Sequence, residues 1–311
     1  MIQKIKTGNR DEWKALRKNY IGGSDAATVV GLNPFASPFS LWAEKTGNAP
    51  EFNGNLATEV GSYLEEFVAR KFSDVTGKTV RRCNMSLVND DYPFAIANVD
   101  RLIVGEDAGL EIKTTSELNM SKFKGGDYPG NYYAQCVHYL AVTGKARWYL
   151  AVLIGNRDFM TFTIERDDDE IAALMDAERD FWNNYVLTRT VPPTDGHSAT
   201  SAAVKAMFDT GDDNVTADLS DMDEIFQIRK VLAERIKDMK SDLDAIDNRV
   251  KVRMQNAIKG TCGRFTVSWK AQNTSGLDRE KIKADYPDID FSKYTSQSRV
   301  FRVTEKKEKT A

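Results

Sequence analysis

The residues FAIANVD (94–100) and GLEIK (109–113) decide the centre of this chain, because they predict two neighbouring apolar strands that each carry a carboxylate. The turn residues GEDAG (105–109) separate them. In a strand, successive side chains point to opposite faces, so Glu111 and Lys113 share one face while their apolar neighbours take the other. The stretch therefore predicts a hairpin with a charged face.

The register of this hairpin determines what the charged face can do. A turn near residues 105–106 places Asp100 opposite Glu111, with Cβ atoms ~4.5–5.5 Å apart. Two ionised carboxylates at that distance repel each other unless one is protonated or a cation lies between them. Oxygen ligands that converge in this way suit Mg²⁺ or Mn²⁺, and Lys113 could orient a water or balance charge. The alternative is a surface ion pair on a half-exposed hairpin, since the same acid-x-Lys triplet also occurs at 12–14, 238–240 and 305–307.

The composition limits the classes of function. The chain has 311 residues, 41% hydrophobic and 29% charged, which is typical of a soluble globular protein with one large domain and a smaller appendage. We find no long apolar run and no apolar leader, so we expect a cytoplasmic protein without a membrane segment. The three cysteines lack C-x-x-C spacing, which argues against disulfide, zinc and iron–sulfur frameworks. With two histidines, the chemistry must depend on carboxylates, lysines and hard cations.

The pattern of elements predicts a mixed α/β domain over residues 1–190. Helices are expected over 13–20, 56–72, 132–142 and 170–185, and strands over 79–88, 94–104, 110–115, 148–154 and 159–164. Residues 191–220, rich in Pro, Thr, Ser, Asp and Gly, have the composition of a linker. Residues 221–260 predict a long amphipathic helix with a coiled-coil seam, and 261–311 a small α+β segment with strands at 263–270 and 299–304.

Two helices offer further polar groups. On the helix 56–72, Glu65 lies at the border of the apolar face and Glu66 points away from it, so Glu65 is the better candidate to reach a neighbouring sheet. Gln135 and Tyr139 are four residues apart and share a helix face. In both cases ordinary solvation or core packing is the alternative.

The N-terminal region could bind an anion. Gly22-Gly23 opens a helix whose backbone N–H groups would face an anion, Ser24 lies at its start, and Arg17 lies just upstream. Helix capping is the alternative role of Ser24. The whole chain has a net charge of -3, which argues against a nucleic-acid partner, but its first 50 residues hold seven basic and four acidic residues.

These residues coincide with a known family. The chain resembles the YqaJ-like viral recombinases, phage-type nucleases similar to lambda exonuclease within the PD-(D/E)xK superfamily. The resemblance spans about residues 11–185 and rests on motifs in one order: IGGSD (21–25), GLNP (31–34), GSYLE (61–65), ANVDR (97–101), LEIKTT (110–115), YAQCVHYL (133–140), IERD (164–167) and FW (181–182). It departs from the superfamily pattern in that Val99, and not Pro, precedes Asp100.

The resemblance implies a restriction-endonuclease-like core, a mixed central sheet flanked by helices, followed by the long helix and its α+β appendage. It implies that Glu65, Asp100, Glu111 and the backbone carbonyl of Ile112 bind Mg²⁺ (or Mn²⁺). It also implies that Lys113 and Gln135 lie in the active site and that Arg17 and Ser24 bind a 5′ phosphate.

The expected activity is 5′→3′ resection of linear double-stranded DNA in phage-type recombination. The resemblance implies a trimer and a single-strand annealing protein as partner, in a bacterial or phage-infected cytoplasm. The alternatives are an endonuclease that uses the same site without needing an end, and a non-catalytic DNA-binding or assembly protein with the helix 221–260 as its interaction element.

Overall fold

The computed structural model describes residues 1–49, 54–212, 214–272, 279–290, 293 and 300–304. The chain forms two compact units, Met1–Asp209 and Thr210–Ala311, which we describe separately. No helix within the described residues is both long and apolar enough to span a bilayer.

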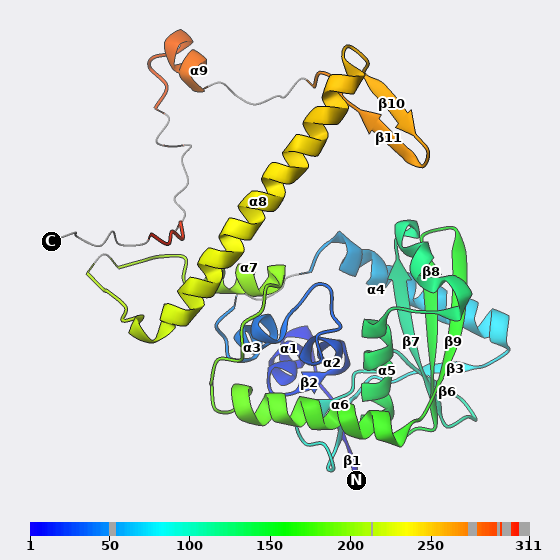
Figure 1. Ribbon diagram of the computed structural model, residues 1–311. Coiled ribbons are helices and arrows are strands. Elements are labelled where there is room, and N and C mark those ends of the chain that lie inside the picture. Colours follow the sequence, from blue (N-terminus) through cyan, green and yellow to red (C-terminus); the bar gives the residue numbers. More distant parts are fainter. Residues whose placement is uncertain (50–53, 213, 273–278, 291–292, 294–299, 305–311) are drawn as a thin grey trace. The chain divides into compact units, whose positions relative to one another are not determined.

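The centre of the first unit is a five-stranded mixed sheet of order β3-β6-β7-β8-β9 (Figure 1). Its strands are β3 (Val80–Arg82), β6 (Arg101–Ile103), β7 (Ala108–Thr115), β8 (Arg147–Ile154) and β9 (Asp158–Glu165). β7 and β8 are parallel and all other neighbours are antiparallel. The expected mixed α/β fold is therefore observed, and the strands expected at 148–154 and 159–164 are β8 and β9, which pair as a hairpin.

Two predicted strands are each divided in the structure. The stretch 79–88 becomes β3 in the central sheet and β4 (Ser86–Asn89), which pairs with β1 (Ile2–Ile5). The stretch 94–104 becomes β5 (Ala95–Ile96) and β6, and β5 runs parallel to β2 (Ile21–Gly22). Continuous β-propensity does not reveal these breaks, because each half finds its partner far away in the sequence.

Helices cover both faces of the sheet, and β7 separates two apolar cores. On one face, Val68, Ala69 and Phe72 of α4 (Leu56–Thr76) pack on the alternate residues Ala108, Leu110 and Ile112 of β7. On the other face lie α5 (Gly130–Thr143), which connects the parallel strands β7 and β8, and the side chain of Glu111. The period-two alternation predicted for this strand is thus what assigns Glu111 to the α5 side.

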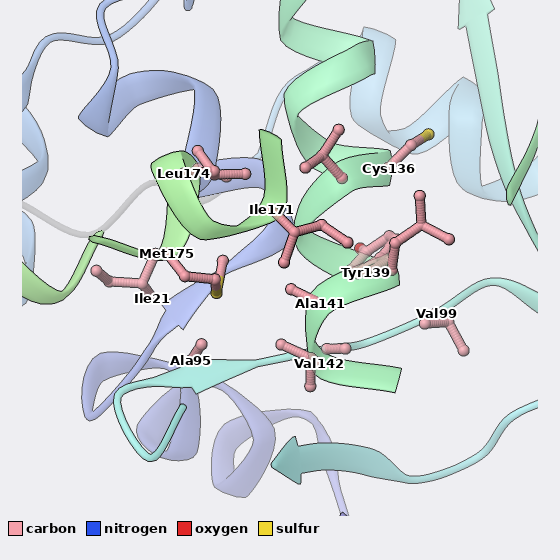
Figure 2. Close-up of a cluster of buried hydrophobic side chains, with 14 of the residues drawn as sticks. Ile21, Ala95, Val99, Cys136, Tyr139, Ala141, Val142, Ile171, Leu174 and Met175 are labelled. Carbon is pink, nitrogen blue, oxygen red and sulfur yellow. The ribbon is translucent and has the colours of Figure 1, made fainter. Parts of the chain in front are cut away.

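The α5 face holds the larger core. Figure 2 shows Cys136, Tyr139 and Val142 of α5 near Ile171 and Met175, which come from α6 (Asp168–Phe181). The buried strands β2 and β5 close this core. The remaining elements of the first unit are α1 (Arg10–Lys18), α2 (Gly23–Val29), α3 (Pro38–Lys45), a 3-10 segment (Glu117–Gly126) and a π-helical extension of α6 (Trp182–Val186).

The segment 191–220, expected to be a linker, contains the helix α7 (Ser198–Met207). Thr200 and Ala203 of α7 are buried, and the hydroxyl of Thr200 donates to the hydroxyl of Ser37 at 2.7 Å, next to α3. The small residues of α7 bury little apolar surface, so the composition resembles that of a loop although the helix packs on the domain.

The second unit contains a long helix, α8 (Asp223–Met254), preceded by a 3-10 turn (Ser220–Met222). The hairpin β10 (Lys259–Cys262) and β11 (Phe265–Ser268) and the short helix α9 (Arg279–Asp285) follow. The predicted strand 263–270 corresponds to β11, but it pairs with β10. The predicted strand 299–304 is not observed over residues 300–304, and residue 299 lies outside the described residues.

A buried ion pair joins α5 and α6. His138 and Glu178 are both fully buried, with Nδ1 of the imidazole 2.8 Å from Oε1 of the carboxylate. The other ring nitrogen, Nε2, lies 3.1 Å from the carbonyl oxygen of Ile96. Because both nitrogens face oxygen acceptors, the doubly protonated imidazolium satisfies the site best. Burial alone would lower the pKa of His138, but the charge of Glu178 outweighs it and raises that pKa, whereas burial raises the pKa of Glu178.

We predict that the stability of the protein falls as the pH rises above neutrality. The folded state holds the proton of His138 more tightly than the unfolded chain, so this contribution is complete below about pH 6.5 and is lost as the pH rises through the raised pKa. In Glu178→Gln the holding charge is absent, so the unfolding free energy should change less over this range. Urea unfolding at a series of pH values measures it, with the exposed Glu44→Gln as control; parallel profiles for wild type and Glu178→Gln would contradict the prediction.

Candidate active site

The carboxylates of Asp100 and Glu111 meet at the end of the β6–β7 ladder. Arg101 pairs with Leu110 and Leu102 with Gly109, so the register continues to Asp100 opposite Glu111, as the turn predicts. Beyond the ladder, Oδ2 of Asp100 accepts the backbone N–H of Ile112 at 2.8 Å. The carboxylate of Asp100 thus takes the place of a backbone acceptor of β6 as the partner of β7. This hydrogen bond holds the carboxylate against β7.

Glu111 is buried, and its two oxygens differ. Oε1 accepts the Nε2–H of Gln135 at 2.7 Å and lies 2.7 Å from Nζ of Lys113. Oε2 is buried without a hydrogen-bond partner in the part of the chain that the structure describes. An unsatisfied buried carboxylate oxygen is costly. A cation or a hydrogen-bond donor bound at this point would therefore satisfy Oε2 of Glu111.

Gln135 connects the carboxylates to α5. Its Oε1 accepts from Nζ of Lys113 at 2.7 Å, and its Nε2 also donates to the hydroxyl of Tyr139 at 3.0 Å. Tyr139 in turn donates to the backbone carbonyl of Asn98 at 3.0 Å. The spacing of four residues places Gln135 and Tyr139 on one face of α5, as predicted, and both face the β7 strand.

Burial and charge set the protonation of these groups. Burial raises the pKa of Asp100 well above its ordinary value, and the neighbouring charge of Glu111 raises it further. Burial would lower the pKa of Lys113, but the attraction of Glu111 outweighs it and raises that pKa. Lys113 is therefore an ammonium ion at neutral pH, a source of positive charge and hydrogen bonds and not a base.

Glu65 is less closely associated with the group formed by Asp100, Glu111, Lys113 and Gln135. It lies on the packed stripe of α4, in line with Val68, Ala69 and Phe72, rather than at the border of the apolar face as the sequence suggested. Because α4 covers the opposite face of the sheet from Glu111, Glu65 reaches the site only at its edge. There its Oε1 accepts a hydrogen bond from Arg101.

The structure does not gather all the predicted metal ligands into one cluster. Within the described residues, no three His, Cys, Asp or Glu side chains are grouped so that they could hold a metal ion. Glu65 and Asp100 do line a common hollow of about 340 Å³, together with Trp13 and Asn98. Arg101, which follows Asp100 directly, is the residue whose importance the sequence did not reveal: its buried guanidinium binds both Glu65 and Glu66.

Arg17 and Ser24 lie together, as the sequence predicted. Nη2 of Arg17 donates to the hydroxyl of Ser24 at 2.9 Å, and the guanidinium lies over the ring of Trp13, 4.9 Å from its centroid. The indole N–H of Trp13 donates to the side chain of Asn98 at 3.0 Å. The Arg17–Ser24 pair is thereby linked to the strand segment that carries Asp100.

A buried ion pair supports this corner. Oδ2 of Asp25 accepts from Nζ of Lys45 at 2.7 Å and from the backbone N–H of Gly22 at 2.9 Å. Burial opposes ionisation of Asp25, but Lys45 and Arg17 outweigh it and lower its pKa. No local pattern points to Lys45, because 20 residues separate it from Asp25.

Close packing joins this corner to α5. A Cβ atom at Gly23 would lie 2.5 Å from the ring of Tyr139, so no larger residue fits there without displacement. Tyr139 therefore contacts both the start of α2 and, through Gln135, the carboxylate group. The corner that holds Arg17 and Ser24 and the group around Glu111 are therefore packed together through Tyr139.

A mixed sheet that carries a Glu-x-Lys pair on one strand, with an Asp directly before the neighbouring strand, is the arrangement that the resemblance to the PD-(D/E)xK class leads us to expect. Comparisons with known proteins identify the family. The model of the YqaJ-like viral recombinase domain matches residues 12–146. The YqaJ protein of Bacillus subtilis (strain 168) is 39% identical over 285 residues, covering 90% of this chain and 89% of that protein. The chain belongs to the YqaJ-like viral recombinase family.

More distant similarities also exist. Protein D345L of African swine fever virus is 51% identical over 55 residues, which cover 18% of this chain and 16% of that protein. The alkaline exonuclease LHK-Exo of Laribacter hongkongensis has a TM-score of 0.49 and 19% identity, covering 58% of this chain and 94% of its own. A phage-related exonuclease from Haemophilus somnus 129PT has a TM-score of 0.41 and 13% identity, covering 57% and 99%.

We predict that Lys45→Met destabilises the protein by about 3 kcal/mol, because it leaves the buried carboxylate of Asp25 without its closest cation. Urea unfolding at pH 7 measures the change. The exposed Lys122→Met is the matched control and should have little effect. Equal stability of Lys45→Met and wild type would show that Asp25 does not depend on this partner.

Proposed function

We propose that this protein is a metal-dependent DNA exonuclease that hydrolyses phosphodiester bonds of linear double-stranded DNA. The observation that carries the proposal is that Asp100, directly before β6, lies opposite Glu111 of β7. Lys113 and Gln135 lie beside Glu111, whose Oε2 is buried without a hydrogen-bond partner among the described residues. Membership of the YqaJ-like viral recombinase family supports it.

The donor set fits a hard divalent cation. Repulsion between Asp100 and Glu111 contributes to the raised pKa of Asp100. A cation bound beside the two carboxylates would reduce this repulsion. The backbone of Ile112 supplies a further oxygen: its N–H faces Asp100, and in a strand the N–H and C=O of one residue point to the same side. Asp100, Glu111 and the carbonyl of Ile112 would thus hold Mg²⁺, with Mn²⁺ as a substitute.

Glu65 would complete this set from the edge of the sheet. It already lines the same hollow as Asp100, and its partner Arg101 also binds Glu66. Arg101 therefore keeps a carboxylate partner when Glu65 turns toward Asp100, so the exchange leaves no isolated buried charge.

The chain's own groups have distinct tasks in the proposed reaction. When bound, the metal ion would lower the pKa of a water and stabilise the leaving oxygen. Lys113, held as an ammonium by Glu111, would position the attacking water and offset the negative charge that develops on the phosphate. Gln135 holds Lys113 and Glu111 at once, so it would fix their relative orientation.

The Arg17–Ser24 pair would bind the 5′ phosphate of the substrate, which favours degradation in the 5′→3′ direction. A guanidinium and a hydroxyl suit a terminal phosphate. The local excess of basic residues in the first 50 residues supports DNA binding there, although the net charge of -3 implies a grip that weakens strongly with salt. The family resemblance extends the proposal to a trimer that acts in the cytoplasm with a single-strand annealing protein.

We predict that Asp100→Asn and Lys113→Ala each reduce Mg²⁺-dependent digestion of linear duplex at least about 1000-fold, because each removes a group of the proposed reaction centre. Release of labelled nucleotides measures the rate, and circular dichroism checks the fold. Asp107→Asn is the matched control, since its exposed carboxylate on the β6–β7 turn pairs with Lys145 and the backbone N–H of Ala146, away from the proposed reaction centre. Undiminished activity in both variants would refute the assignment.

Substrate topology separates the alternatives. An exonuclease spares closed-circular duplex, whereas an endonuclease at the same site cuts it. Duplexes labelled at the 5′ or the 3′ end give the direction. No nucleotide release from 5′-phosphorylated duplex with Mg²⁺ or Mn²⁺ would favour a non-catalytic DNA-binding protein.

We predict that Arg17→Ala removes a preference for 5′-phosphorylated over 5′-hydroxyl duplex, and that this preference is about tenfold or more in the wild type. The ratio of initial rates on the two substrates measures it. Arg10→Ala, an exposed arginine on the same helix, should keep the preference. An unchanged ratio in Arg17→Ala would place the phosphate elsewhere.

A further inference from the structure

The helix α8 presents an apolar seam that the described residues of the second unit leave uncovered. It is 32 residues long, about 48 Å, and no residue of it is buried, although the structure describes all of it. Its large apolar side chains are between 38% and 70% exposed at Ile225, Ile228, Leu232, Ile236, Met239, Leu243, Ile246 and Val250. A seam of this length on a single helix requires a partner to be stable in water.

The spacing of the seam is that of a coiled coil. From Ile236 to Val250 the apolar residues alternate at three and four positions, so Ile236, Leu243 and Val250 occupy a and Met239 and Ile246 occupy d. One extra spacing of four, from Leu232 to Ile236, shifts the phase of the N-terminal part. The seam after residue 235 is therefore a regular two-heptad segment.

The charges beside this segment disfavour a parallel pair of identical helices. In a parallel pair, g of one helix faces the following e of the other. Here that puts Asp242 opposite Asp247 of the second copy, and Arg235 opposite Lys240. Both contacts are repulsive, and symmetry makes each occur twice.

An antiparallel pair turns the same charges into attractive contacts. There, a packs against d, e faces e and g faces g. With Leu243 of one copy in the same layer as Ile246 of the other, Lys240 faces Asp247 and Asp242 faces Arg249. If the register shifts by one heptad in one direction, Lys240 faces Lys240 of the second copy and Asp242 faces Asp242. If it shifts in the other direction, Asp247 faces Asp247 and Arg249 faces Arg249. The register is thus specified by charge as well as by apolar packing.

These four charged groups are available for such contacts. Lys240, Asp242, Asp247 and Arg249 are exposed, and none of them makes an ion pair within the described residues. Lys240 and Asp247 have an opposite charge four residues further along the same helix, at Asp244 and Lys251. Asp242 and Arg249 have none at a spacing of three or four, so a second helix is needed to supply one.

The hairpin that follows α8 supplies the end of the same surface. A hollow of about 430 Å³ lies between Ile246, Val250 and Met254 of the helix and Gly260, Cys262 and Val267 of the hairpin. In the antiparallel register, the N-terminal seam of the second copy (Ile225, Ile228, Leu232) runs past the end of the first helix and alongside this hairpin. The change of phase at residues 232–236 falls where the partner changes from helix to hairpin.

We propose that α8 is a homodimerisation element, and that it pairs with α8 of a second copy of this chain as an antiparallel coiled coil centred between Leu243 and Ile246. α8 belongs to the second unit, whereas the residues of the proposed active site belong to the first.

Sedimentation equilibrium of the full chain tests the pairing. Leu243→Glu should halve the mass of the assembly, whereas Ser241→Glu, on the outer face at position f, should leave it unchanged. Because Leu243 is 57% exposed, it has little packing within the described part of the second unit to lose. Equal masses for wild type and Leu243→Glu would overturn the proposal.

Charge reversal tests the direction. In the antiparallel register, Asp247→Lys puts Lys opposite Lys240 and should raise the dimer Kd about tenfold, and adding Lys240→Asp should restore it. In a parallel pair, Asp247→Lys would instead face Asp242 and strengthen the dimer. A lowered Kd would therefore overturn the antiparallel arrangement.

Cross-linking tests the register. Met239 of one copy shares a layer with Val250 of the other, so Met239→Cys and Val250→Cys chains should form a disulfide-linked dimer when mixed, and neither should do so alone. Both are made with Cys262→Ser, because Cys262 is exposed. A self-linked dimer of either variant, or no linked dimer in the mixture, would contradict the register.

Discussion

The pairing of β6 with β7 is the constraint on which the rest of the first unit depends. It ends at Arg101 and Leu110, so Asp100 takes over as the partner of β7 and its carboxylate faces Glu111. That contact is unfavourable by itself, and the surroundings compensate for it. Lys113 and Gln135 supply hydrogen bonds, and α5 holds them because its crossover joins β7 to β8. Two unfavourable features remain: the repulsion that acts on Asp100, and the unsatisfied Oε2 of Glu111. A bound cation would remove both.

Local periodicity was sufficient to predict the parts of the site that lie within single elements or one hairpin. The register of Asp100 and Glu111 follows from the turn, the shared face of Glu111 and Lys113 from strand alternation, and that of Gln135 and Tyr139 from helical spacing. Arg17 and Ser24 were predictable because only a short segment separates them.

The rest depends on contacts between distant segments, which periodicity does not encode. Arg101 binds Glu65 across 36 positions and Lys45 binds Asp25 across 20, so neither pair leaves a local pattern. The division of 79–88 and 94–104 into separate strands has the same origin, because each half pairs with a different partner. The helix α7 escaped prediction because its small residues resemble a loop in composition.

The contact of Gly23 with Tyr139 would affect the length of DNA between a bound 5′ end and the cleaved bond. Since the ring of Tyr139 from α5 packs directly against Gly23 of α2, a shift of the Arg17–Ser24 pair would be transmitted through Tyr139 and Gln135 to Glu111. On the proposed function, the distance from a held 5′ end to the cleaved bond is then a fixed length of backbone. The protein would act as a molecular ruler, and the size of the released product would be set by rigid packing rather than by base sequence.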